Sequence, residues 1–243
     1  MIVIYIDSQS DTAFLKECYK GIDNIILLYN PTKEEVNKTL AENPDEDVMM
    51  LGHGSPSGLF SADWKGNVVD YSNALRLKGR NCIGIWCWAK KFAKNYGLKG
   101  YFTSMFISNE SEARSFGYNA TDKEVFDEVD FFARAINGLI KDGVPYDKWV
   151  GKLQSIADMS KDFVKYNYDG MEYFDGTQQA DLAGDCGYLF GNDVEDDLYS
   201  SDNEVDMWFE DYCYEHGIEG DWAKDIAYPI FVAGWNSHKN SMV

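Results

Sequence analysis

Two residues with side chains suited to covalent chemistry, His53 and Cys87, stand at the ends of neighbouring hydrophobic segments. His53 follows the run 47–51 and lies between two glycines, and Cys87 follows the run 82–86. A cysteine thiolate is a strong nucleophile, and an imidazole beside it takes the thiol proton and later protonates the leaving group. These residue types predict a Cys-His dyad for acyl transfer, with Cys87 as the nucleophile and His53 as the general base and acid.

The elements that must position the dyad alternate between β-rich runs and helical patterns over about the first 110 residues. Such alternation is typical of an α/β fold with a mainly parallel sheet covered by helices on both faces. The expected strands are 2–6, 24–29, 47–51, 82–86 and 100–107, and the expected helices are 11–19, 31–43, a short one before 82, and 88–96. The nearly continuous apolar run at 24–29 predicts burial on both faces. In such sheets the ligand site lies beyond the carboxyl ends of the strands, where His53 and Cys87 fall.

Helix starts are predicted by residues that pair a short polar side chain with a glutamate three positions later, which is the capping-box pattern. The pairs are Thr32 with Glu35, Asn109 with Glu112, and Thr121 with Glu124. Long helical periods follow at 122–141 and 146–168, and both are expected to pack on the sheet. The stretch 169–187 is rich in Gly and Asp and is predicted to be a loop, with a short sixth strand at 188–190.

The chain is expected to contain an α/β domain over 1–190 and an appendage over 191–243. Residues 191–211 are rich in Asp and Glu and contain no Lys or Arg, which predicts a solvated acidic loop. Two aromatic-rich segments, 205–216 and 221–238, then predict a helical hairpin.

The aromatic runs Trp208-Phe209-Glu210 and Phe231-Val232-Ala233-Gly234-Trp235 resemble a short C-terminal module of many phage-encoded proteins. This resemblance implies a protein that works in the cytoplasm of an infected bacterium, on a host factor.

The charge balance excludes some classes of partner. The formal net charge is -19, from 41 acidic and 22 basic residues. Nucleic-acid binding depends on Lys and Arg, so we expect no direct nucleic-acid binding. An acidic surface can instead attract a basic protein partner, and a decoy that acts through 191–211 is one of the hypotheses.

The compartment follows from the N-terminus and the cysteines. Residues 1–7 have no basic region, and no stretch approaches the roughly 20 apolar residues of a membrane span. The five cysteines are odd in number and form no C-x-x-C pair, so neither a disulfide framework nor a zinc ribbon is indicated. We expect a cytoplasmic protein without membrane association.

Metal and nucleotide cofactors are not expected. The other histidines, His216 and His238, are distant from His53 in sequence and lack ligand spacing. The loop 52–58 has neither the lysine of a Walker motif nor a G-x-G-x-x-G spacing. The dyad itself needs only backbone N–H groups to hold an oxyanion, for which Gly54 and Cys87 are the candidates.

The two motifs Val48-Met49-Met50-Leu51-Gly52-His53-Gly54 and Ile83-Gly84-Ile85-Trp86-Cys87-Trp88-Ala89 resemble those of the caspase-like cysteine peptidases, which include clostripain, legumain, gingipains and bacterial caspase homologues. The resemblance covers roughly the first 115 residues. It implies a caspase-hemoglobinase-like fold, hydrolysis of a protein or peptide substrate by His53 and Cys87, and a substrate pocket lined by the segment 100–112.

The candidate pocket wall, 104–112, predicts substrate preference. Ser104, Glu110 and Glu112 are the candidate substrate-binding residues, and no basic residue precedes Arg114 in this stretch. A partly desolvated carboxylate favours a cationic side chain, which predicts cleavage after Arg or Lys.

The alternative is a catalytically inactive binding protein of the same fold. Trp86 and Trp88 place bulk on both sides of Cys87, where the resembling family more often has small or acidic residues. Such a protein would use the strand-end pocket to hold a small molecule or a peptide.

Overall fold

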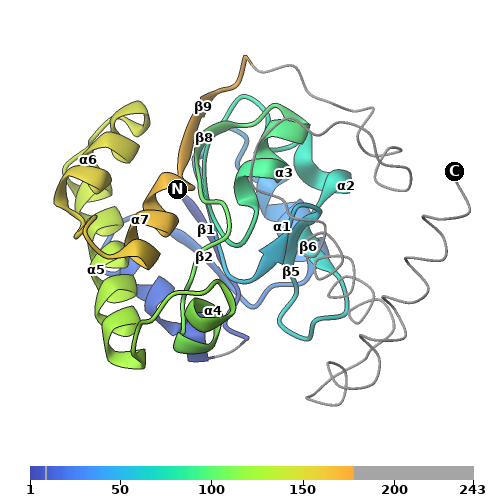
Figure 1. The fold of residues 1–243 in the computed structure, drawn as a ribbon. Coiled ribbons are helices and arrows are strands. Elements are labelled where there is room, and N and C mark those ends of the chain that lie inside the picture. The colour runs from blue at the N-terminus through green and yellow to red at the C-terminus, as the bar shows by residue number, and fades with distance from the viewer. Residues whose placement is uncertain (9, 178–243) are drawn as a thin grey trace, which may run out of the picture. The chain divides into compact units, whose positions relative to one another are not determined.

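The structure, a computed structural model, describes residues 1–8 and 10–177 (Figure 1). The strand predicted at 188–190, the appendage 191–243 and the acidic segment 191–211 lie outside the described residues. Apart from residues 64–66, the described residues belong to one compact unit.

A six-stranded sheet in the order β2-β1-β3-β7-β8-β9 forms the centre of this unit. Its strands are β1 (Ile2–Tyr5), β2 (Ile26–Tyr29), β3 (Val48–Leu51), β7 (Asn81–Ile85), β8 (Lys99–Phe102) and β9 (Glu172–Asp175). Neighbouring strands are parallel except for the pair β8 and β9. The predicted α/β class is therefore confirmed as a mixed, mostly parallel sheet with helices.

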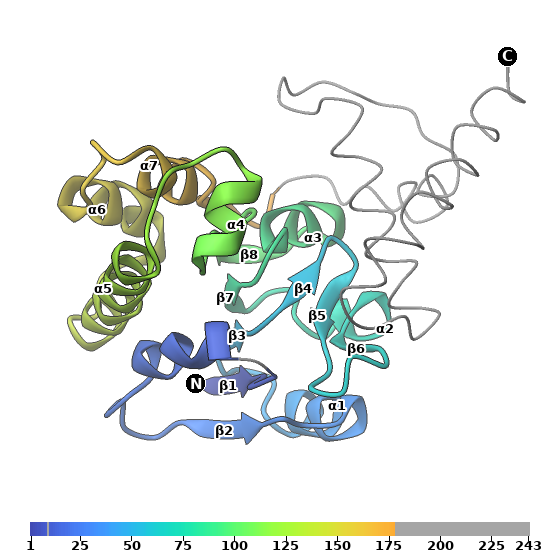
Figure 2. The same ribbon diagram turned by 60° about the horizontal axis from the view of Figure 1, so that its bottom comes forward.

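Helices cover both faces of the sheet (Figure 2). Alternate residues of a strand face opposite sides, and in β1 the side chains of Val3 and Tyr5 enter one hydrophobic cluster while Ile2 and Ile4 enter the other. The first cluster includes side chains of η1 (Ser10–Cys18, a 3₁₀ helix), α4 (Glu110–Ser115), α5 (Asp122–Lys141), α6 (Trp149–Ile156) and α7 (Asp162–Asp169). The second includes side chains of α1 (Lys33–Glu42), α2 (Tyr71–Ala74) and α3 (Ala89–Tyr96). Within the described ranges no helix is both long and apolar enough to cross a membrane.

The segment between β3 and β7 contains a small antiparallel sheet that the sequence did not predict. Its strands are β4 (Gly54–Ser55), β5 (Gly58–Phe60) and β6 (Asn67–Val69). Gly58 has φ +146°, and a Cβ there would lie 1.9 Å from the carbonyl oxygen of Val69, so only glycine fits this close crossing. The small sheet begins directly after His53 and fixes the chain at that point.

Two strand predictions were wrong. The run at 24–29 is not buried on both faces, because β2 is the edge strand of the sheet and exposes 43% of Leu27 and 53% of Tyr29. The stretch 169–187, predicted as a loop, contains β9, which pairs antiparallel with β8. β9 is short and carries an acidic residue at each end, Glu172 and Asp175, so its β signal is weak.

The predicted helix 146–168 is interrupted. It consists of a 3₁₀ turn η2 (Tyr146–Lys148), then α6 and α7. The break follows from Ala157, which has an extended backbone, and from a tight turn in which Asp158 Oδ1 accepts a hydrogen bond from Ser160 Oγ at 2.6 Å. A short polar side chain that bonds its own backbone neighbours competes with the helix.

Candidate active site

His53 and Cys87 occupy equivalent positions at the carboxyl edge of the sheet. β3 and β7 are parallel neighbours, and their last paired residues are Leu51 and Ile85. His53 and Cys87 each lie two residues beyond this pair. The register of the sheet therefore brings these two positions to the same edge of the sheet.

Both side chains line one small pocket, and both are partly exposed. The pocket has a volume of about 20 Å³, which is room for about one water molecule. Its other walls include Thr12 and Phe14 from η1, and Phe106 and Ser108 from the segment that follows β8. Phe106 and Ser108 fall within the segment 100–112 that was predicted to line the pocket. Thr12 and Phe14 were not predicted, although they lie in the segment that follows the parallel strand β1, where a ligand site is expected.

Thr103 and Trp86 hold the turn that carries Cys87. The buried Thr103 donates its hydroxyl hydrogen bond to the carbonyl oxygen of Trp86 at 2.9 Å, and its own carbonyl accepts from Lys90 N at 2.8 Å. The Trp86 ring is 2% exposed, and its Nε1 donates to the carbonyl oxygen of Ser55 at 3.1 Å. The Trp86 ring is thus buried in the core, and its hydrogen bond to Ser55 joins the small sheet to the end of β7.

The backbone turns sharply directly after Cys87. Trp88 has φ 70°, in the left-handed region that a bulky residue rarely adopts, and α3 begins at the next residue. The Trp88 carbonyl accepts hydrogen bonds from Lys91 N and Phe92 N, which fixes this conformation. Backbone strain of this kind persists only where the surrounding structure holds it, and it is concentrated at functional sites.

The backbone of His53 and Gly54 is held by β5 of the small sheet. The His53 carbonyl accepts from Phe60 N at 3.0 Å, and Gly54 lies opposite Leu59. In this antiparallel arrangement the Gly54 N–H points away from β5, so β5 does not use it. A Cβ at Gly54 would lie 2.2 Å from the Trp86 ring, so glycine is also required for packing.

The donors at the start of α3 are already used. Ala89 N donates to the Trp86 carbonyl, and Lys90 N donates to the Thr103 carbonyl. These two N–H groups are therefore not available to a substrate oxyanion.

The predicted substrate-binding residues do not form a common acidic wall. Glu110 forms an ion pair with Arg114, and its other carboxylate oxygen accepts from Asp122 N at 3.2 Å. Ser104 packs against Gly170, 3.0 Å from the position that a Cβ would take there.

Glu112 is the one of these residues that adjoins the pocket, because it bonds to a lining residue. Its Oε2 accepts from Ser108 N at 2.7 Å and from Ser108 Oγ at 3.0 Å. Asn109 caps α4 by accepting from Glu112 N, but the Glu112 carboxylate bonds to Ser108 instead of completing the predicted capping box. The boxes at Thr32 and Thr121 are complete.

The surroundings of Cys87 differ from those of the other described cysteines. Cys18 and Cys82 are fully buried, and burial raises the pKa of both thiols, that of Cys82 to about 12. Both pack in the hydrophobic clusters. No group of three or more metal-ligating side chains occurs among the described residues.

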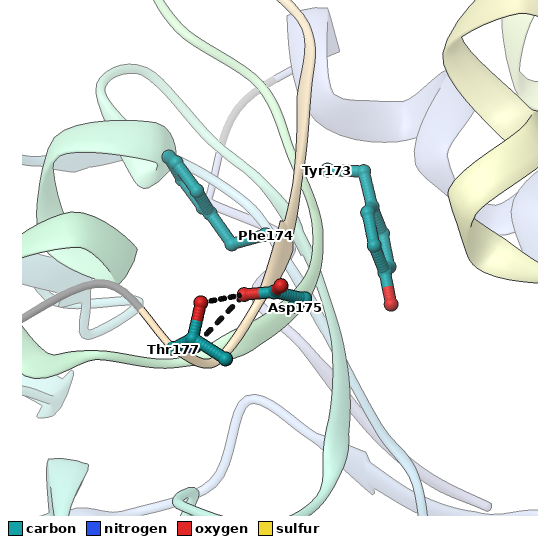
Figure 3. A pocket seen from close by; sticks show the side chains of 4 residues that line it. All are labelled: Tyr173, Phe174, Asp175 and Thr177. Carbon is teal, nitrogen blue, oxygen red and sulfur yellow. Dashed lines mark hydrogen bonds between the residues drawn. The ribbon is translucent and has the colours of Figure 1, made fainter.

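A second hollow lies over β9 and does not have the chemistry of the first (Figure 3). Tyr173 and Phe174 point to opposite sides of the strand, and Thr177 donates through its N–H and its hydroxyl to Asp175 Oδ1 at 2.8 and 2.6 Å. The lining residues that the structure describes there include no thiol and no imidazole.

Comparison with known proteins gives no match, either among protein-family models or among curated sequences.

Proposed function

We propose that this protein is a caspase-like cysteine peptidase in which Cys87 is the nucleophile and His53 is the general base and acid. The observation that carries the proposal is the parallel register of β3 and β7, which brings both side chains into one pocket open to solvent. The strained turn at Trp88 and the bonds of Thr103 further support it, because they fix the Cys87 backbone.

The reaction follows from this arrangement. His53 takes the thiol proton as Cys87 Sγ attacks the carbonyl carbon of the peptide bond. The N–H groups of Gly54 and Cys87 hold the oxyanion of the tetrahedral intermediate. His53 gives its proton to the leaving nitrogen, the C–N bond breaks, and a thioester remains on Cys87. His53 then takes a proton from water, whose oxygen attacks the thioester, and the proton returns to Cys87 as the acid product leaves.

A library of unstructured peptides, analysed by mass spectrometry after incubation, tests the proposal. We expect defined cleavage products with the native protein and none with Cys87→Ala. A matched control is Cys82→Ala, which removes a buried thiol from β7 and should retain cleavage. Equal product formation by the native protein and Cys87→Ala would reject Cys87 as the nucleophile.

The second candidate is a binding protein that uses the same pocket without turnover. The small volume of the pocket, about 20 Å³, favours the absence of turnover, because a scissile peptide bond must enter the pocket to reach Cys87, whereas a bound partner needs only to cover the mouth of the pocket. In that case a peptide or small molecule that binds the native protein should bind Cys87→Ala equally well, and neither protein should cleave it.

A further inference from the structure

Two stacked rings, those of Phe14 and Phe106, form an apolar wall of the pocket that contains His53 and Cys87. The ring centroids are 6.2 Å apart, and the rings are inclined by 19°. Phe106 is 5% exposed, and its ring packs on that of Phe132 in α5, with the centroids 4.8 Å apart. The core therefore fixes Phe106, and Phe14, which is half-buried, is the more accessible ring of the two.

The segment η1 is anchored on both sides of its pocket-lining aromatic ring. Before the ring, the carbonyl oxygen of Thr12 accepts a hydrogen bond from the buried Tyr5 hydroxyl at 3.2 Å. After the ring, Leu15 is buried in the core, and Lys16 Nζ forms an ion pair with Asp7 Oδ2 at 2.8 Å. An outward movement of this wall would break the bonds on both sides, so the structure holds the wall against the pocket.

The walls leave very little space beside the candidate nucleophile. The volume of about 20 Å³ is room for about one water molecule, which is similar in size to a methyl group. Attack by Cys87 Sγ needs the carbonyl carbon about 3 to 3.5 Å from the sulfur, so the adjacent Cα of the substrate also comes against these walls. A hydrogen atom or a methyl group on that Cα fits the space. A longer side chain meets the rings of Phe14 and Phe106.

The pocket also offers no ion-pair partner for a charged side chain. The lining residues that the structure describes include no Asp, Glu, Lys or Arg. The adjoining carboxylate, that of Glu112, accepts two hydrogen bonds from Ser108, and neither it nor Glu110 lines the pocket. A charged group that entered would lose hydration without a compensating charge on the lining residues.

We infer, on the basis of the proposed peptidase function, that Phe14 and Phe106 restrict the residue before the scissile bond to glycine or alanine. This assignment takes the place of the preference for Arg or Lys that Glu110 and Glu112 suggested. The selection is steric, so a smaller side chain at position 14 should relieve it.

Peptidyl acyloxymethyl ketones that differ only in the residue beside the ketone test the inference on the full chain. The Cys87 thiolate forms a C–S bond to the methylene carbon of the probe, while the C–O bond breaks and the carboxylate leaves with the electron pair. The residues compared are Gly, Ala, Leu, Phe, Arg and Asp. The readout is the rate of alkylation at Cys87, mapped by mass spectrometry and divided by the rate with iodoacetamide, which carries no side chain. We expect the Gly and Ala probes to react at least about tenfold faster than the other four.

Variants of Phe14 change the space in both directions. Phe14→Ala should raise the normalised rates of the Leu and Phe probes about tenfold and leave that of the Gly probe within about twofold. Phe14→Trp should slow the Ala probe relative to the Gly probe. Phe126→Ala removes an exposed aromatic ring from α5 as a matched control and should leave every rate unchanged. Thermal unfolding shows which variants are folded, and Phe14→Leu, a milder change, replaces Phe14→Ala if that variant is not.

The outcomes distinguish the two proposals. If no peptidyl probe alkylates Cys87 although iodoacetamide does, the peptidase proposal fails. If the probes alkylate Cys87 but a larger residue reacts as fast as Gly and Ala, or if a folded Phe14→Ala or Phe14→Leu variant keeps the native preference, the peptidase proposal stands and the steric restriction by Phe14 and Phe106 is overturned.

Discussion

Cys82 and Cys87 lie near opposite ends of β7, and one thiol is buried while the other is partly exposed. Cys82 lies in the first half of β7, has no exposed surface and donates a hydrogen bond to the Leu77 carbonyl at 3.7 Å. Cys87 lies just beyond the end of β7, is partly exposed and shares a pocket with His53.

The comparison shows what makes a thiol a candidate nucleophile. Burial raises the pKa of Cys82 to about 12, so this thiol stays protonated and acts as a small apolar side chain. The carboxyl end of a parallel strand offers solvent, an adjacent strand end and a turn into a helix. Position relative to that end, more than residue type, therefore separates the two roles.

The largest expected difference is in the alkylation rates of the two thiols in the native protein. Cys82 reacts only after the core opens, so we expect iodoacetamide to modify Cys87 at least about 1,000-fold faster under native conditions. In denaturant the two rates should converge. Similar native rates, measured by peptide mapping over time, would remove the contrast.

The next effect concerns the partner of the thiol. His53→Ala removes the general base and acid, and we expect kcat/KM for a cleaved peptide to fall about 10² to 10⁴-fold. Thermal unfolding should change little, because His53 is partly exposed. A loss of activity that tracks a loss of folded protein would instead mean that His53 has a structural role.

Thr103 is expected to have a smaller effect, because it acts through the Cys87 turn. Thr103→Val keeps the shape but leaves the Trp86 carbonyl without its hydroxyl donor, which should lower the free energy of unfolding by about 1–2 kcal/mol. The alkylation rate of Cys87 should fall about tenfold, and Thr103→Ser should restore it. A full stability loss with an unchanged rate at Cys87 would show that the turn does not depend on this bond.

The smallest expected effect concerns a buried carboxylate, that of Glu128, whose pKa is raised by burial as the pKa of Cys82 is. Glu128 on α5 is 8% exposed, and burial raises its pKa. A raised folded-state pKa means that Glu128 favours folding below the ordinary carboxyl pKa of about 4.5, and that this contribution is lost as pH rises through the folded value.

Glu128→Gln should therefore raise the free energy of unfolding at pH 7 and should give no gain at pH 4. Denaturant titrations at the two pH values measure this difference. Glu124→Gln is the matched control with the opposite sign: hydrogen bonds from Thr121 lower the pKa of its exposed carboxylate, so no gain is expected at pH 7.

The arrangement of the candidate pair was predictable from the sequence, because parallel strands bring their carboxyl ends to one edge. The hydrophobic runs before His53 and Cys87 became adjacent strands with the register that this prediction needs. The complete capping boxes at Thr32 and Thr121 were also predictable, since they depend on residues three positions apart.

Features that depend on distant contacts were not predictable in the same way. β9 exists because β8 pairs with it, and its own sequence gives little β signal. The contact of Tyr166 with Phe116 joins segments that are far apart in the sequence, and only the folded chain brings them together. The carboxylates of Glu110 and Glu112 have separate partners, Arg114 and Asp122 N for Glu110 and Ser108 for Glu112, which the residue types alone did not predict.

The pH dependence of Cys87 alkylation, compared between the native protein and His53→Ala, tests the central claim most directly. An imidazole that shares a proton with the thiol should place the midpoint of the rate below the value of about 8.5 typical of a free thiol. We expect the midpoint to move up towards 8.5 in His53→Ala. A midpoint near 8.5 in both proteins would show that His53 and Cys87 do not act as a pair, and would contradict the account.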